Sequence, residues 1–126
     1  MDTLFYTDAQ NNVPMLKNCV FSFVANGSSD PDATLNRGNY IASALYSTTG
    51  THIVTLTGGF YRLDDVEAMI DADSSGGGAY ATVYCPDEQA NPLVLHVFTH
   101  AADGTKTNYT GRRVRLTIQA SDADFQ

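Results

Sequence analysis

Short runs of apolar and β-branched residues, each ended by turn-forming residues, recur along almost the whole chain of 126 residues. Apolar residues at helical spacing are almost absent. Runs of this length and spacing are typical of an all-β sandwich or barrel. We therefore predict an antiparallel, jelly-roll-like β-sandwich of about eight strands, at residues 4–7, 19–25, 40–47, 52–57, 66–72, 79–85, 93–99 and 113–120.

Two of these runs differ in their patterning. The run at 113–120 alternates, with Val114, Leu116, Ile118 and Ala120 on one face and Arg113, Arg115, Thr117 and Gln119 on the other. One face is expected to pack and the other to meet water or a partner. The run at 93–99 places apolar side chains on both faces. It is predicted to be a central strand or part of a subunit contact.

The stretch SALYSTTGTHIVTL, residues 43–56, predicts a β-hairpin. Gly50 adopts a positive φ without steric cost, which a tight hairpin loop requires. On the returning strand, Ile53 and Thr55 share one face, and Val54 and Leu56 share the other.

The turn-forming clusters, such as 27–32 and 74–78, do not resemble a domain linker, and the glycine-rich stretch at 74–78 is expected to be a long hairpin tip. A chain of this length is expected to form one domain. We predict an N-terminal edge strand or arm at 1–16, a β-sandwich domain at 17–121 and a short tail at 122–126.

The charge pattern argues against nucleic acid and membrane partners. The net charge is −7, from 14 acidic and 7 basic residues, and an acidic surface repels phosphate backbones. No apolar run approaches the ~20 residues that span a bilayer, and no secretory signal pattern opens the chain, which favours a soluble intracellular product. Arg113 and Arg115, beside Arg112, form either a solvated strand edge or a salt-bridging contact with an acidic partner.

Cysteines and histidines do not form an evident site in the sequence. Cys19 and Cys85 are expected to be small apolar thiols, and a bridge between them stays open. His96 and His100 are four residues apart on a predicted strand, so their Cα atoms lie ~13 Å apart. That separation is too large for two ligands of one zinc ion. Hydrogen-bonded or solvated histidines are expected.

Close carboxylate pairs occur at Asp30 and Asp32 and at Asp71 and Asp73, with others at 64–65 and 122–124. The loop at 71–76 opens like a calcium loop, but it lacks a third carboxylate and has Thr82 at its twelfth position. Turn capping is the expected role, with calcium as the alternative. No serine-nucleophile, phosphate-loop or dinucleotide motif occurs. We predict no enzyme, no cofactor and no metal, with an Asp-pair hydrolase as the remaining catalytic alternative.

The middle of the chain resembles a known family. The residues that carry the likeness are Phe21 and Phe23, Arg-Gly at 37–38, Ile-Ala-Ser at 41–43, GTHIVTL at 50–56, and Phe60, Leu63, Val66, Ala68 and Ile70. Together they resemble the small β-sandwich cement, or decoration, proteins of tailed bacteriophage capsids. His52-Ile53 stands where that family often has an aromatic-led pair. The run at 114–118 looks like the closing strand of the same fold.

The resemblance implies a viral structural protein, made in the host cytoplasm, that binds the capsid exterior of the virion. It would act as a homotrimer and stabilise contacts between subunits of the major capsid protein, without catalysis. The contact is predicted at the N-terminal residues Leu4, Phe5 and Tyr6, with Arg113 and Arg115 as helpers. Apolar side chains outside the clearly alternating strands need a partner to cover them.

An alternative stays open. Related hairpins occur in trimeric receptor-binding and fibre-tip domains, which implies a binding module for a glycan or host surface. In that case, Tyr80, Tyr84 and Tyr109 are the candidate contact residues.

Overall fold

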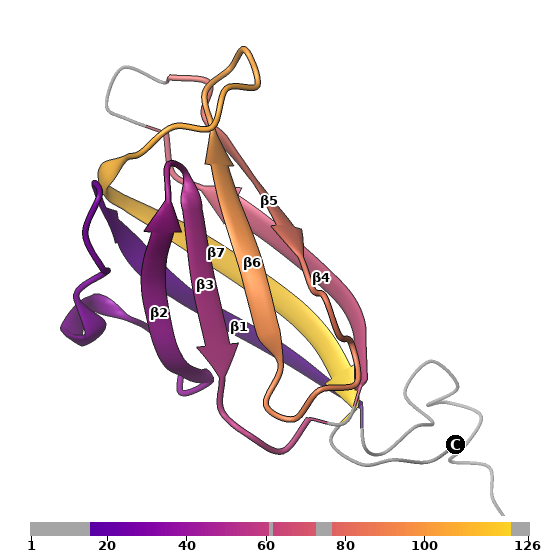
Figure 1. Cartoon of the computed structure of the whole chain (residues 1–126). Coiled ribbons are helices and arrows are strands. Elements are labelled where there is room, and N and C mark those ends of the chain that lie inside the picture. The colour runs from indigo at the N-terminus through magenta and orange to yellow at the C-terminus, as the bar shows by residue number, and fades with distance from the viewer. Residues whose placement is uncertain (1–15, 61, 73–76, 122–126) are drawn as a thin grey trace, which may run out of the picture.

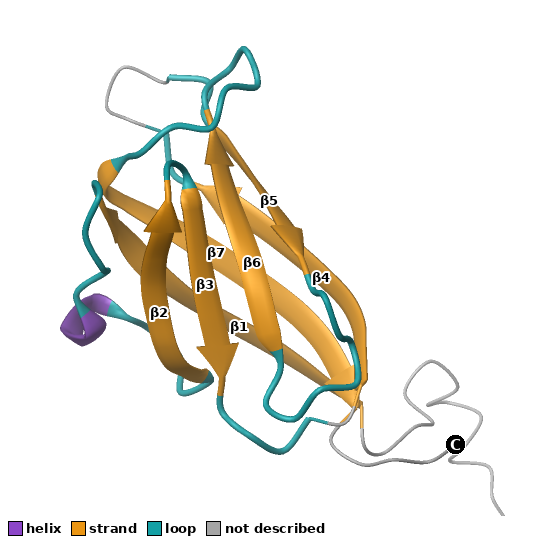
Figure 2. Ribbon diagram, viewed as in Figure 1, coloured by secondary structure: helices purple, strands orange, loops and turns teal. Residues whose placement is uncertain are grey.

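The computed structural model describes residues 16–60, 62–72 and 77–121, and they form two packed antiparallel sheets (Figure 1). One sheet has the strand order β1 (Leu16–Asn26), β7 (Thr110–Ser121), β4 (Arg62–Ile70). The other has the order β2 (Ile41–Thr48), β3 (Thr51–Leu56), β6 (Val94–His100), β5 (Tyr80–Tyr84). A single 3-10 turn, η2 (Ala33–Leu35), is the only helical element within these residues (Figure 2). The predicted all-β sandwich is confirmed.

Seven of the eight predicted strands are present, each within a few residues of its predicted position. The eighth, at 4–7, lies outside the described residues, as do the rest of the arm up to residue 15 and the tail at 122–126. The first described strand, β1, starts at Leu16, which pairs with Ser121 at the end of β7.

The alternation of β7 supplies four residues of the core. Val114, Leu116, Ile118 and Ala120 are at most 1% exposed and face the other sheet, as predicted. Because β7 pairs with β1 on one side and β4 on the other, it is the middle strand of its sheet. The interpretation of Arg113 and Arg115 as a solvated strand edge is therefore wrong.

β6 is the corresponding inner strand of the other sheet, between β3 and β5. Its side chains alternate between buried and half-buried, with Leu95, Val97 and Thr99 pointing into the core. The predicted central position is confirmed. The outward apolar residues Val94 and Phe98 are only half-buried, so they are open to a partner.

The predicted hairpin joins β2 to β3 through Thr49 and Gly50, with Thr48 opposite Thr51. Gly50 has φ +64°, and a Cβ there would lie 2.8 Å from the backbone nitrogen of Thr107. The turn therefore needs glycine both for its conformation and for its close approach to the loop after β6. The predicted division of the two faces is confirmed, and the structure shows that Val54 and Leu56 are buried whereas Ile53 and Thr55 face outward.

The segment between β1 and β2 runs along the open edge of β1. Ser22 and Arg37 exchange two backbone hydrogen bonds, of 3.0 and 2.9 Å. The carboxylate of Asp30 accepts a hydrogen bond of 2.8 Å from the backbone N–H of Tyr46 in β2. This segment thus occupies part of both strand edges on that side of the sandwich, which limits pairing with another chain there.

Candidate binding surface

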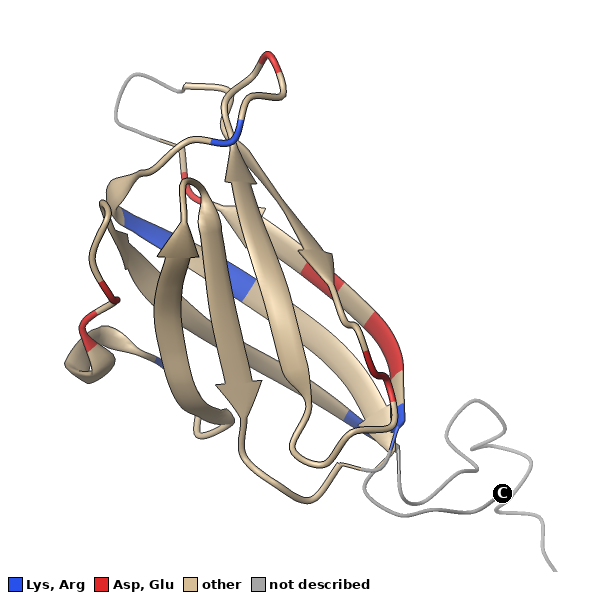
Figure 3. Cartoon of the chain, viewed as in Figure 1, with Lys and Arg blue, Asp and Glu red and all other residues tan. Residues whose placement is uncertain are grey.

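Charged residues of the strands are confined to one of the two sheets. β2, β3, β5 and β6 contain no Asp, Glu, Lys or Arg. Figure 3 shows the strands of this sheet uncoloured and the charges on the sheet behind it. The charged strand residues are Lys17, Arg62, Asp64, Asp65, Glu67, Arg112, Arg113 and Arg115.

The outward side of the uncharged sheet is rich in apolar and aromatic side chains, and we call it the neutral face. It consists of Ser43, Leu45, Ile53, Thr55, Tyr80, Thr82, Tyr84, Val94, His96, Phe98 and His100. One cross-strand row runs Leu45, Ile53, His96, Tyr84. Its end members Leu45 and Tyr84 are 48% and 56% exposed. Contiguous exposed apolar surface of this kind marks interaction sites.

Aromatic pairs order the side chains of the neutral face. Tyr80 stacks on His100, with ring centroids 4.7 Å apart and planes at 14°. Tyr84 contacts His96 edge-on at 5.9 Å. At the loop end, Lys106 places its Nζ atom 4.5 Å from the centre of the Phe98 ring. These contacts hold the outward rings in fixed positions before any partner binds.

His100 also makes two hydrogen bonds. Its Nδ1 lies 3.2 Å from the carbonyl oxygen of Gly104, and its Nε2 lies 2.9 Å from the hydroxyl of Thr82. The carbonyl can only accept, so Nδ1 carries the proton and Thr82 donates to Nε2. A hydroxyl next to a base resembles the start of a nucleophilic site, but catalysis also needs oxyanion donors and an enclosed site. Thr82 is exposed on an open sheet, so a hydrogen-bonded histidine, as predicted, describes this group.

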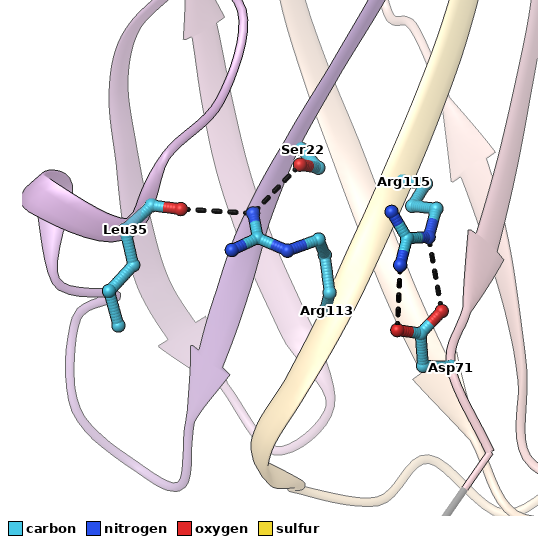
Figure 4. A network of polar contacts seen from close by, with 5 residues as sticks. All are labelled: Ser22, Leu35, Asp71, Arg113 and Arg115. Atoms are coloured by element: carbon cyan, nitrogen blue, oxygen red, sulfur yellow. Dashed lines mark hydrogen bonds and ion pairs between the residues drawn. The ribbon is translucent and has the colours of Figure 1, made fainter.

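The outward side of the other sheet is charged, and it contains the two predicted arginines (Figure 4). Arg115 forms a two-pronged ion pair with Asp71, with distances of 3.1 and 2.9 Å. Arg113 donates through Nη1 to the Ser22 hydroxyl at 2.8 Å and to the Leu35 carbonyl at 2.9 Å. Both guanidinium groups therefore have partners within the chain.

A shallow hollow of about 170 Å³ lies on this charged side, between β1 and β4. Val20 and Met69, 65% and 64% exposed, are part of its lining, together with Glu67 and Arg115. Its mixture of apolar and charged groups distinguishes it from the neutral face. The predicted contact residues Leu4, Phe5 and Tyr6 lie outside the described residues.

Several of the carboxylates that the structure describes have structural partners. Asp32 accepts from the N–H and hydroxyl of Thr34 at 3.0 and 2.8 Å, and these hydrogen bonds lower the pKa of Asp32. Asp30 caps the β2 edge, and Asp71 pairs with Arg115. Turn capping is thus confirmed for Asp32. Among residues 16–60, 62–72 and 77–121, no group of three or more His, Cys, Asp or Glu side chains could hold a metal ion. Asp73 lies outside these residues.

Both cysteines are free thiols. Cys19 is buried on the inner side of β1, and Cys85 is half-buried after β5. Burial raises the pKa of Cys85, while its hydrogen bond to the Asp87 backbone opposes that shift. A raised pKa keeps the thiol protonated and poorly reactive. The bridge that the sequence left open is absent.

Sequence reasoning missed two features that the structure reveals. The first is the neutral face, because six of the eight predicted strands lack charged residues and the sequence does not show which four of them share a sheet. The second is His52, which is buried on the same side of β3 as Val54 and Leu56. Because side chains alternate between the two faces of a strand, the sequence pattern placed His52 on the same face as positions 54 and 56.

Comparisons with known proteins identify no relative of this chain. No protein-family model, curated protein or solved structure matches this chain. Within the described part of the chain, no helix has the length and hydrophobicity needed to cross a membrane.

Proposed function

We propose that this chain is a capsid cement protein that binds the outer surface of a tailed-bacteriophage head and stabilises contacts between major capsid protein subunits. The observation that supports this most is the antiparallel β-sandwich itself, which is the fold that the family-like residues imply. The residues that resemble the cement family suggest that the larger assembly is a phage head. Among them, Gly50 lies in the turn between β2 and β3, and the alternating apolar residues after it lie in β3.

The physical mechanism is adhesion. DNA packed inside a head pushes outward, and a protein that spans neighbouring subunits favours the assembled state to which it binds. At a free concentration of about 100 times Kd, each occupied site is stabilised by about 2.7 kcal/mol. Because a shell has many equivalent sites, these contributions accumulate over the particle.

The proposed shell contact keeps the N-terminal residues Leu4, Phe5 and Tyr6 as its apolar part. Arg115 contributes while paired with Asp71, since its side chain is still 46% exposed and its guanidinium can donate hydrogen bonds to further acceptor groups. Arg113 acts through the Ser22 and Leu35 contacts that hold the neighbouring loop in place.

Heat stability of heads tests the proposal. Heads of the phage that encodes the chain are heated after stripping and after re-addition of purified protein, and DNA release is followed by dye fluorescence. We expect release at a higher temperature with the protein bound. Equal release temperatures at full occupancy, or virions that lack the protein, would refute the proposal. A variant without residues 2–12 is expected to lose occupancy, and full occupancy would exclude the N-terminal contact.

A trimeric receptor-binding or fibre-tip domain is the second candidate function. It is favoured by the outward position of Tyr84 and Tyr80 on the neutral face. However, His100 covers one ring face of Tyr80, and Arg112 covers one ring face of Tyr109 at 4.3 Å. Sugar stacking needs free ring faces, so this candidate is less well supported. If added protein blocks phage adsorption to cells, this function replaces the first.

A further inference from the structure

We infer that the neutral face is the surface through which the chain binds a second copy of itself. The inference rests on the proposed function, since the resemblance behind that function implies that copies of the chain associate, and it identifies the residues that make this contact. It depends on three observations: where the charges lie, how large the face is and how its side chains are held.

The charge distribution favours a second copy on this side. Each copy has a net charge of −7, so two copies repel each other at close range. Acidic groups lie at the rim of this face, with Asp30 beside β2 and Asp87 and Glu88 after β5, and on the charged sheet, at Asp65 and Glu67. Contact through the neutral face can leave these acidic groups in water at its rim, where they keep their hydration. Lys106, whose Nζ lies over the Phe98 ring, is a cation that the contact would bring close to the acidic second copy.

Distance weakens the remaining repulsion. The charged sheet lies ~10 Å behind the uncharged one, as packed sheets generally do. In a contact between neutral faces, the charged sheets of the two copies are therefore separated by more than two such spacings. The screening length at physiological salt is ~8 Å, so repulsion between the charged sheets is largely screened. A contact between charged faces would instead bring Glu67 and Asp65 of both copies together.

The size of the face sets the expected strength. Four strands spaced ~4.8 Å apart and six residues long at ~3.3 Å give a patch of ~400 Å² in projection. A standard interface buries ~800 Å² per partner, so this contact belongs to the weak end of specific association. Weak pairwise contacts suit an assembly that becomes stable only when several of them form together.

The outward side chains of the neutral face already have the arrangement that a flat contact needs. Leu45 and Tyr84 are the most exposed apolar residues of the face, at opposite ends of one cross-strand row. Tyr80 is held against His100 and Tyr84 against His96. Little rotamer freedom is therefore lost when a second copy packs on them. The same face on both copies gives a dimer, whereas this face against another surface gives a ring such as a trimer.

Paired charge substitutions test the inference. The test protein has Leu45→Glu and Tyr84→Glu on the neutral face. The control has Val20→Glu and Met69→Glu, two apolar residues on the charged side that are 65% and 64% exposed, somewhat more than Leu45 and Tyr84. Association is measured by sedimentation velocity and light scattering from about 10 μM to about 1 mM, a range that covers weak contacts. Circular dichroism and thermal unfolding confirm that both variants are folded.

We expect the wild-type chain to associate, the neutral-face variant to bind itself at least tenfold more weakly, and the control to behave as wild type. Association of the wild type is also expected to rise between about 50 and 500 mM NaCl, because salt screens the repulsion between copies. A wild type that stays monomeric at about 1 mM overturns the inference. So does equal weakening in both variants, or association that falls with salt, because either outcome would place the contact elsewhere.

Head binding separates this inference from the proposed function. If the chain associates through the neutral face but does not bind heads, the inference stands and the capsid function fails. If a monomeric chain binds heads and the neutral-face variant does not, the face contacts the shell, so the inference fails and the capsid function stands.

Discussion

The buried histidine His52 predicts a measurable pH dependence of stability. Its side chain is 1% exposed and lies between the rings of Phe23 and Tyr46, at 5.0 and 6.0 Å. Neither ring nitrogen has a hydrogen-bond partner among the described residues. Burial lowers the pKa of His52 below its ordinary value of 6.5, and the Asp30 carboxylate opposes that shift only in part. The folded protein therefore holds His52 neutral.

The direction of the effect follows from proton binding. Below about pH 6.5, the unfolded chain protonates this histidine while the folded chain does not, so the free energy of unfolding falls as the pH falls. Above the unfolded pKa this contribution to stability is fully present. Each pH unit corresponds to about 1.4 kcal/mol, so the loss by about pH 5 is at most about 2 kcal/mol.

Replacement of His52 by leucine removes the effect. The variant loses two buried nitrogens without partners, which cost about 1–3 kcal/mol when left unsatisfied. It also loses ring contacts with Phe23 and Tyr46, which are worth about 0.5–1.5 kcal/mol each. These terms nearly cancel at about pH 7.5, so we expect similar stability there. At about pH 5 we expect His52→Leu to be more stable than wild type, by up to about 2 kcal/mol.

Urea unfolding at low protein concentration, at about pH 7.5 and about pH 5, measures this difference. His96 and His100 are present in both proteins, so their contributions cancel in the comparison. Identical changes with pH in the two proteins would refute the reasoning. A variant that is more than about 2 kcal/mol less stable at about pH 7.5 would also contradict it, because the ring nitrogens would then have partners.

Three further predictions concern the sandwich itself, and all are measured by urea unfolding. Gly50→Ala is expected to cost more than about 2 kcal/mol, because its Cβ would meet two backbone atoms at 2.8 Å. Gly111→Ala, at φ +76° with nothing within 4 Å, is expected to cost only about 1–2 kcal/mol, and equal losses would contradict this account. Leu116→Ala should cost about 2–5 kcal/mol because the side chain is fully buried, whereas the neighbouring exposed Thr117→Ala should cost under about 0.5 kcal/mol. Arg115→Gln breaks an ion pair whose members are 46% and 41% exposed, so a loss above about 1 kcal/mol would be unexpected.

The candidate surface was predictable only in part from the sequence. The outward positions of Tyr80 and Tyr84 follow from the alternation of their strand, since Ala81 and Val83 pack toward the core. The pairing of Tyr80 with His100 did not follow, because cross-strand neighbours depend on which strands pair and in which register. The partners of Arg115 and Arg113 could not be predicted from the sequence either. Asp71 is 44 residues from Arg115, and Leu35 is 78 residues from Arg113.

The sequence by itself determined the local features of this protein. Strand positions, the hairpin at Gly50 and the buried face of β7 all follow from a period of two and from turn chemistry, which act between residues close in the chain. The tertiary structure alone decided that β7 lies between β1 and β4, and that the four uncharged strands join into one sheet. Strand order depends on how two sheets best bury their apolar faces together, a property of the whole chain and not of any segment. The neutral face exists because that choice collected the uncharged strands on one side and left the charged ones on the other.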